Sequence, residues 1–68
     1  MNYCVVLKYS QDDKSYIVSV PDLPGCMTDG KIPNEAYENA KNVITEWIDT
    51  AKATGREVPE PKFGQENF

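Results

Sequence analysis

The residue types that carry most enzyme chemistry are sparse in this chain of 68 residues. There is no histidine, so the commonest general base and metal ligand is missing. Ser10, Ser15 and Ser19 have no base to activate them, and none lies in the Gly-x-Ser-x-Gly setting of a hydrolase nucleophile. Serine-based hydrolysis is therefore not predicted.

Cys4 and Cys26 lack the Cys-x-x-Cys spacing, and without histidine they do not indicate a zinc site. The chain starts directly with a strand-like run, so we expect no leader, and it has no apolar stretch near the ~20 residues that span a bilayer. We therefore expect a cytoplasmic protein with reduced thiols that pack as small hydrophobes. Cys26 follows a turn and is the thiol to test for reactivity.

Carboxylates are the most abundant charged groups, with 11 acidic residues against 7 basic ones and a net charge of −4. A two-metal nuclease needs several carboxylates that converge on one point. The acidic residues here fall in turns or on the outer face of a predicted helix, where Glu38, Asn42 and Glu46 follow a spacing of four. This pattern is typical of a solvated face and predicts no catalytic, cofactor or metal site.

The seven basic residues are scattered singly, whereas direct nucleic-acid binding is typical of clustered lysine and arginine. An acidic surface suits a basic protein partner, because complementary charge speeds encounter. A net charge of −4 also simply keeps a small protein soluble. Both interpretations fit the charge.

Two alternating apolar runs, residues 3–7 and 16–20, flank a short polar link and predict a β-hairpin. The second run enters a rigid turn framed by Pro21, Pro24 and Gly25. A third short strand is predicted at residues 26–28.

From residue 34 the apolar period changes to that of a helix. The stripe consists of Ala36, Ala40, Val43, Ile44, Trp47, Ile48 and Ala51. Pro33 suits the first helical position and Gly55 suits the residue just past the end. Trp47 lies in the middle of the stripe, so we expect it to pack in the core rather than to stack on a base.

Residues 56–61 are extended by their prolines and are expected to add an edge strand. The predicted fold is α+β in the order β-β-β-α-β, a small antiparallel sheet with one long helix on one face. The other face carries Cys4, Val6 and Ile17 and is more apolar than a solvated face should be. Something is expected to cover it, and we predict a homodimer or a higher homo-oligomer.

Together these elements resemble the HicB family of antitoxins, with a match from residue 3 to about residue 61. The matching residues are the strand Tyr3–Leu7, the run Tyr16–Cys26, Thr28, Gly30, Glu35, Ala36, Asn39, Ala40, Ile44, Trp47, Ile48, Ala51, Gly55 and Pro59–Pro61. The Pro-Asp-Leu-Pro-Gly-Cys turn followed by such a helix is specific. The resemblance implies a HicB-like domain over residues 1–61, with a partial ribonuclease-H-like fold that lacks nuclease residues, and a flexible tail over residues 62–68.

The resemblance further implies an antitoxin of a type II pair that binds a small basic HicA-like ribonuclease toxin and occludes its RNA-binding face. The protein would have no chemistry and no cofactor of its own. Partner contacts are expected from four carboxylates of the turn and the helix exterior, Asp22, Asp29, Glu38 and Glu46.

Many family members carry a second, DNA-binding domain, for which residues 62–68 are too short, so direct DNA binding is not expected. Two alternatives stay open at this level. One is a self-associating structural or interaction domain without a toxin partner, and the other is a residual metal-dependent nuclease, which would need at least three carboxylates in one pocket.

Overall fold

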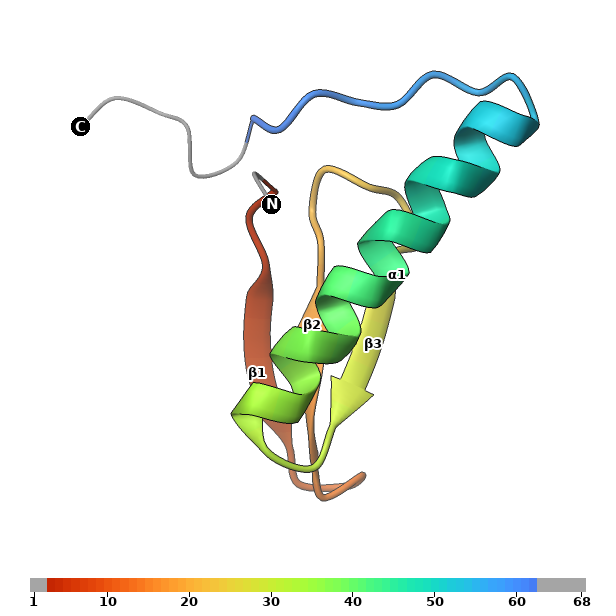
Figure 1. Cartoon of the computed structure of the whole chain (residues 1–68). Helices are drawn as coiled ribbons and strands as arrows, with labels where there is room; N and C mark the ends of the chain where they lie inside the picture. The colour runs from red at the N-terminus through yellow and green to blue at the C-terminus, as the bar shows by residue number, and fades with distance from the viewer. Residues whose placement is uncertain (1–2, 63–68) are drawn as a thin grey trace.

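The computed structural model describes residues 3–62. Three strands, β1 (Val6–Ser10), β2 (Ser15–Ser19) and β3 (Met27–Gly30), precede one long helix, α1 (Pro33–Ala53) (Figure 1). The sheet has the order β1-β2-β3, and both strand pairs are antiparallel. The predicted α+β architecture is confirmed, and most of the predicted tail, residues 63–68, lies outside the described residues. Within residues 3–62, no helix has the length and apolarity needed to cross a bilayer.

The register of the sheet determines which backbone groups point to its open edges. Val20 donates its N–H to the Cys26 carbonyl at 3.0 Å, which continues the register of β2 with β3. Hydrogen-bonded pairs alternate along an antiparallel ladder, so Val18 bonds to Thr28 while Ser19 turns its backbone groups to Val6. It follows that the backbone groups of Met27 and Asp29 point away from β2 on one edge. The backbone groups of Leu7 and Tyr9 point away from β2 on the opposite edge of the sheet, at β1.

The link from β2 to β3 is the predicted proline turn. The Leu23 N–H donates to the Val20 carbonyl and the Cys26 N–H to the Leu23 carbonyl, both at 3.0 Å. Gly25 adopts a φ of +78°, a backbone conformation that is unfavourable for residues with a Cβ atom. The Leu23 side chain is fully buried, so the turn also contributes to the core.

Helix α1 begins at Pro33, whose missing N–H needs no partner at this position. Its end is a Schellman motif. Gly55 has a φ of +74°, and the N–H groups of Arg56 and Gly55 donate to the carbonyls of Ala51 and Lys52 at 2.8 and 3.3 Å. Both helix boundaries thus agree with the sequence prediction.

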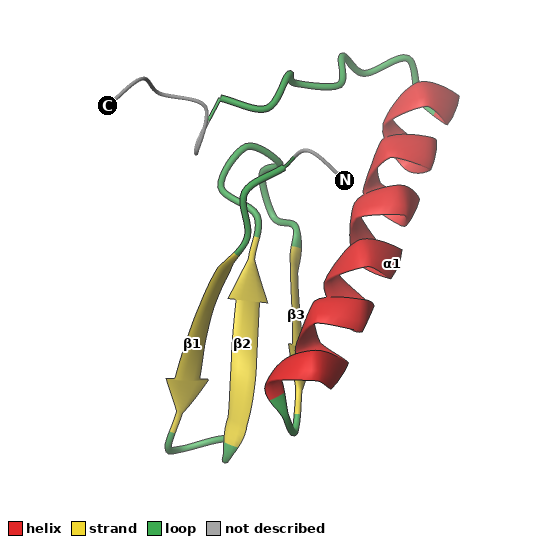
Figure 2. Cartoon of the chain, turned by 60° about the vertical axis from the view of Figure 1, so that its left-hand side comes forward, coloured by secondary structure: helices red, strands yellow, loops and turns green. Residues whose placement is uncertain are grey.

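The helix covers β2 and β3 but not β1 (Figure 2). One core cluster consists of Val20, Leu23, Cys26 and Ile44, with half-buried Trp47 against it. A second cluster joins Val18 to Ala36 and Ala40. Because both alanines are fully buried and short, the first half of α1 lies close to the sheet.

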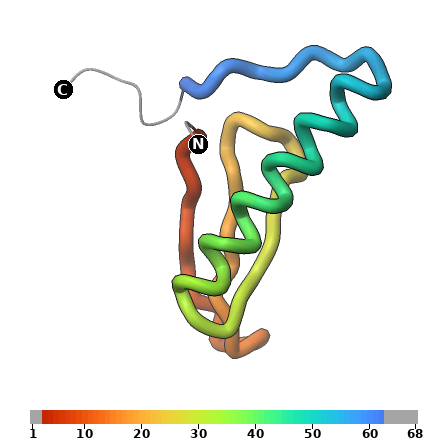
Figure 3. The backbone as a smooth tube through the Cα atoms, in the orientation of Figure 1, coloured from red at the N-terminus to blue at the C-terminus, as the bar shows by residue number. Residues whose placement is uncertain are grey.

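The predicted edge strand at residues 56–61 does not form: within the part of the chain that the structure describes, this segment joins no sheet. Pro59 and Pro61 have no N–H to donate to a ladder. The segment instead runs back from α1 toward the start of the chain (Figure 3). It is held by a hydrogen bond from the Tyr3 hydroxyl to the Pro59 carbonyl and by another from the Lys62 N–H to Asp22 Oδ2.

The outer face of the sheet, opposite α1, carries Val6, Ile17 and Met27. Val6 is exposed and Ile17 half-buried, as expected for an uncovered face, whereas Cys4 is half-buried beside the start of β1. Met27 is 59% exposed and extends the apolar area.

Candidate interaction surface

The described residues contain no arrangement suited to metal chemistry. Within residues 3–62, no group of three or more cysteine or acidic side chains is placed to hold a metal ion. The residual nuclease alternative required such a cluster, so the described structure offers it no support.

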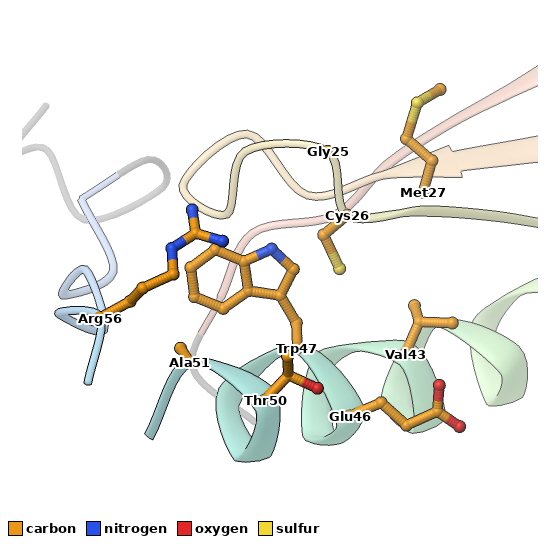
Figure 4. Close-up of a pocket in the computed structure, with 9 residues that line it drawn as sticks. All are labelled: Gly25, Cys26, Met27, Val43, Glu46, Trp47, Thr50, Ala51 and Arg56. Carbon is orange, nitrogen blue, oxygen red and sulfur yellow. The ribbon is translucent and has the colours of Figure 1, made fainter. Parts of the chain in front are cut away.

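A cleft of about 270 Å³ lies between the second half of α1 and the end of the proline turn (Figure 4). Its lining residues are Gly25, Cys26, Met27, Val43, Glu46, Trp47, Thr50, Ala51 and Arg56. The floor is apolar, and the charged side chains of Glu46 and Arg56 stand on its rim. The cleft is therefore suited to an apolar side chain from a partner whose neighbouring residues are polar.

Trp47 forms one wall of this cleft and anchors the turn to the helix. Its Nε1–H donates to the Pro24 carbonyl at 2.9 Å, and the Arg56 guanidinium lies 5.5 Å from the ring centroid. The indole is half-buried against the first core cluster. The prediction that Trp47 packs in the core is thus correct for one side of the ring, while the other side is part of the surface.

Cys26 lies at the base of the cleft, with its side chain directed toward α1 (Figure 4). Only 4% of the residue is exposed, and burial raises the pKa of its thiol. The thiol therefore stays protonated near neutral pH, which disfavours the reactivity for which the sequence had singled it out.

The open edge of β3 runs beside α1 and continues the cleft. Asn39 donates from Nδ2 to the outward-facing Asp29 carbonyl at 2.8 Å. On the helix, Val43 and Glu46 follow Asn39 by one and two turns and line the cleft beside Met27. We call this strip, made of Met27, Asp29, Asn39, Val43 and Glu46, the β3 groove.

Two of the four carboxylates predicted to bind a partner belong to the β3 groove. Asp29 and Glu46 are both exposed. Glu38 is also exposed, but it forms an ion pair with Lys41 at 2.7 Å. Asp22 is half-buried in the proline turn and accepts the hydrogen bond from Lys62. Asp29 lies across from Ile17, so its side chain is on the outer face of the sheet, whereas Glu46 lines the cleft on the helix side. The two carboxylates therefore lie on opposite sides of the open β3 edge, and the other two take part in other interactions.

Met27, Val43 and Arg56 were missed as surface residues by the sequence analysis. Val43 counted as part of the core stripe, and Arg56 as part of an extended strand. A signal was available for Met27, because strict alternation from buried Cys26 places it on the outer face.

Residues 3–66 match the family model described as the HicB-like antitoxin of bacterial toxin–antitoxin systems. The chain belongs to this family. A UPF0150 protein of Thermoplasma acidophilum, Ta0767, is 39% identical over 59 residues, which cover 87% of this chain and 84% of that protein. A UPF0150 protein of Archaeoglobus fulgidus is 35% identical over 52 residues, 76% of this chain and 74% of that protein.

A third relative of this HicB-like chain is an uncharacterized 14.9 kDa protein from the rep-hol intergenic region of Haemophilus phage HP1. It is 43% identical over 44 residues, which cover 65% of this chain but 33% of the phage protein. The shared part thus occurs both in small proteins of similar length and within a longer one.

Proposed function

We propose that this HicB-like chain is the antitoxin of a type II pair and neutralises a small, basic, HicA-like ribonuclease by covering its RNA-binding surface. The observation that carries the proposal is the β3 groove, where an open strand edge adjoins an apolar cleft, with exposed Glu46 on the cleft and exposed Asp29 on the outer side of the edge. A ribonuclease surface that binds phosphates is basic, so it is complementary to Asp29 and Glu46.

The inhibition requires no chemistry from this chain. Backbone groups of Met27 at the open edge offer hydrogen bonds to an extended segment of the toxin, in the manner of strand addition. The cleft beside Trp47 accepts an apolar side chain, and the carboxylates pair with basic residues that otherwise hold RNA. The antitoxin thus competes with RNA for the same charged surface.

Long-range attraction sets the rate of binding. The chain carries a net charge of −4, which steers a basic partner toward it at low ionic strength. Salt screens this attraction over about 8 Å at physiological strength. Asp29 and Glu46 come first as contacts, and Asp22 and Glu38 come second because each already has an intramolecular partner.

The test is a titration of purified antitoxin against a basic ribonuclease encoded beside it, with cleavage of RNA as the readout. We expect cleavage to stop near one antitoxin per toxin. Glu46→Lys should slow association and reduce its dependence on salt. Asp12→Lys makes the same change of charge on the exposed β1–β2 turn and controls for the overall field.

If Glu46→Lys and Asp12→Lys slowed association equally, the effect would come from the overall charge of the chain. The proposed contact at the β3 groove would then be wrong. Full cleavage in the presence of excess antitoxin would refute the inhibitor role itself. Metal-dependent cleavage of RNA by this chain alone would favour the nuclease alternative instead.

A further inference from the structure

The open edge of β3 offers little backbone to a partner. Its outward-facing groups belong to Met27 and Asp29, but the Asp29 carbonyl already accepts a hydrogen bond from Asn39 Nδ2 at 2.8 Å. On the other side of Met27, the φ of +78° at Gly25 takes the chain out of the extended conformation. In the described part of this edge, an added strand can therefore exchange both hydrogen bonds of an antiparallel pair with Met27 alone.

We propose that Asn39 stops strand addition at Met27, and that the groove therefore selects its partner by side chains. The segment it selects is a short extended stretch of a basic protein in which lysine or arginine directly precedes a large apolar residue. This inference rests on the proposed function, because it names the kind of toxin segment that the β3 groove would hold.

The cleft determines the apolar residue of the segment. Directly opposed residues of paired strands share a face, and neighbours along a strand alternate. The partner residue across from Cys26 therefore points to the helix side, where Cys26 forms the base of the cleft. The second half of α1 runs past the open edge of β3 (Figure 1), so this side chain would enter the cleft of about 270 Å³ against Val43 and Trp47.

The outer face determines the basic residue. Met27 and Asp29 lie two residues apart in β3, so both point to this face. The partner residue across from Met27 points there too, and Asp29 is its diagonal neighbour, within reach of a long side chain. Lysine or arginine would lay its stem on Met27, which is 59% exposed, and bring its charge to the Asp29 carboxylate.

The order of the two residues follows from strand direction. In an antiparallel pair the partner residue across from Met27 precedes the one across from Cys26, so the basic residue comes first. The reverse order would suit a parallel strand, whose pairing is slightly less stable.

Asn39 makes these side chains decisive. A long open edge pairs with almost any extended chain through backbone groups alone. With the Asp29 carbonyl occupied, the backbone contributes a single pair, and a segment that lacks the basic or the apolar residue gains little from the edge. The same hydrogen bond thus protects β3 from unselective pairing and confers specificity on the groove.

The test uses capped synthetic peptides and the isotope-labelled full chain, followed by NMR. The short peptide is acetyl-Thr-Lys-Leu-Thr-amide, and the long one carries one more threonine after the acetyl group. We expect saturable shifts at the Met27 amide and the Trp47 indole N–H, with dissociation constants on the order of 1 mM. The amides of Leu7 and Tyr9, on the opposite edge, should not move, and shifts there instead of at Met27 would overturn the proposal.

The two peptides measure the stop directly. The extra residue of the long peptide lies across from Asp29, and its N–H finds the carbonyl occupied, so both peptides should bind the parent chain equally. Asn39→Ala frees this carbonyl, and the long peptide should then bind about 2- to 10-fold more tightly than the short one, the gain from one hydrogen bond. Asn42→Ala, the same substitution at an exposed residue three positions along α1, should leave the two peptides equal. If both bind equally to a folded Asn39→Ala variant, Asn39 is not a stop.

The side-chain preferences have their own controls. Alanine in place of the peptide leucine should weaken binding by about 10-fold. Glutamine in place of the lysine should weaken it by about 2- to 5-fold, and Asp29→Asn should abolish this difference. Asp12→Asn, the same loss of charge on the β1–β2 turn, should preserve it. A peptide with leucine before lysine that binds as tightly would overturn the proposed order.

The peptides and the RNA-cleavage titration separate the two levels of the argument. If no saturable shift occurs up to about 10 mM peptide, roughly ten times the expected dissociation constant, while the antitoxin still stops cleavage, this inference is wrong and the proposed function stands. If the peptides bind as expected but cleavage continues in excess antitoxin, the segment preference stands and the inhibitor role is wrong.

Discussion

Replacement of Trp47 by alanine tests whether the indole connects the proline turn to the helix as described. Full truncation of a buried tryptophan costs about 3–5 kcal/mol, and for the half-buried Trp47 we take about 2 kcal/mol. Loss of the hydrogen bond to Pro24 adds about 1 kcal/mol. Loss of the contact with Arg56 adds about 0.5 kcal/mol. The expected loss is therefore about 3.5 kcal/mol of unfolding free energy.

Such a loss is large for this domain. At about 0.05–0.15 kcal/mol per residue, a chain of 68 residues has roughly 3–10 kcal/mol in total. Urea denaturation followed by circular dichroism, at one fixed protein concentration because association adds stability, measures the change. The melting temperature should fall by roughly 20 °C, since each kcal/mol shifts it by about 4–8 °C.

Trp47→Phe is the matched control, because it keeps most of the apolar ring but cannot donate to Pro24. This variant should lose about 1 kcal/mol of unfolding free energy, the contribution of the hydrogen bond. If Trp47→Ala costs less than Trp47→Phe, or less than about 1 kcal/mol, the indole does not hold the turn against α1, and its role in the cleft must be reconsidered.

The remaining predictions concern two glycines and one thiol. Gly30→Ala should destabilise by about 2–3 kcal/mol in thermal unfolding, because its Cβ would meet the backbone of Ala36. Gly55→Ala, with open space but a φ of +74°, should cost about 1 kcal/mol, and a cost equal to that of Gly30→Ala would contradict this distinction. Cys26 should resist a thiol reagent until the protein unfolds. Because burial raises its pKa above the usual 9.0, the folded state holds this proton more tightly, so its contribution to stability should be intact below about pH 9 and fall as pH rises further. A Cys26→Ala variant should lack that alkaline loss.

The elements with strong local signals were predictable from sequence. The apolar period of α1, with Pro33 before it and Gly55 after it, determined both boundaries, because helix capping depends on residues close in the chain. Alternation also predicted the hairpin, but its first strand, predicted at residues 3–7, runs from Val6 to Ser10. The third strand was shifted: predicted at residues 26–28, it runs from Met27 to Gly30. Asp29 and Gly30 have little strand propensity of their own and are recruited by pairing with β2.

The failed prediction at residues 56–61 has a different physical origin. Prolines favour an extended backbone locally, but a strand also needs donors and a neighbouring edge, and Pro59 and Pro61 provide no donors. The same limit applies to the interaction surface. Charge alone marked four carboxylates, but the bond between Asp22 and Lys62 joins residues 40 positions apart. Only the folded chain shows that Glu46 lines the cleft and that Asp29 lies at the open edge of β3 with its side chain on the outer face.

The small residues between α1 and the sheet determine the width of the β3 groove. Gly30, Ala36 and Ala40 set how deeply the start of the helix sits on the strands, and this depth determines how far the rest of α1 stands from the open edge of β3. Single methyl groups at these buried positions would widen or tilt the groove without altering any residue that meets a partner. The shape of the proposed partner surface is therefore determined in part by buried residues in the interior of this domain.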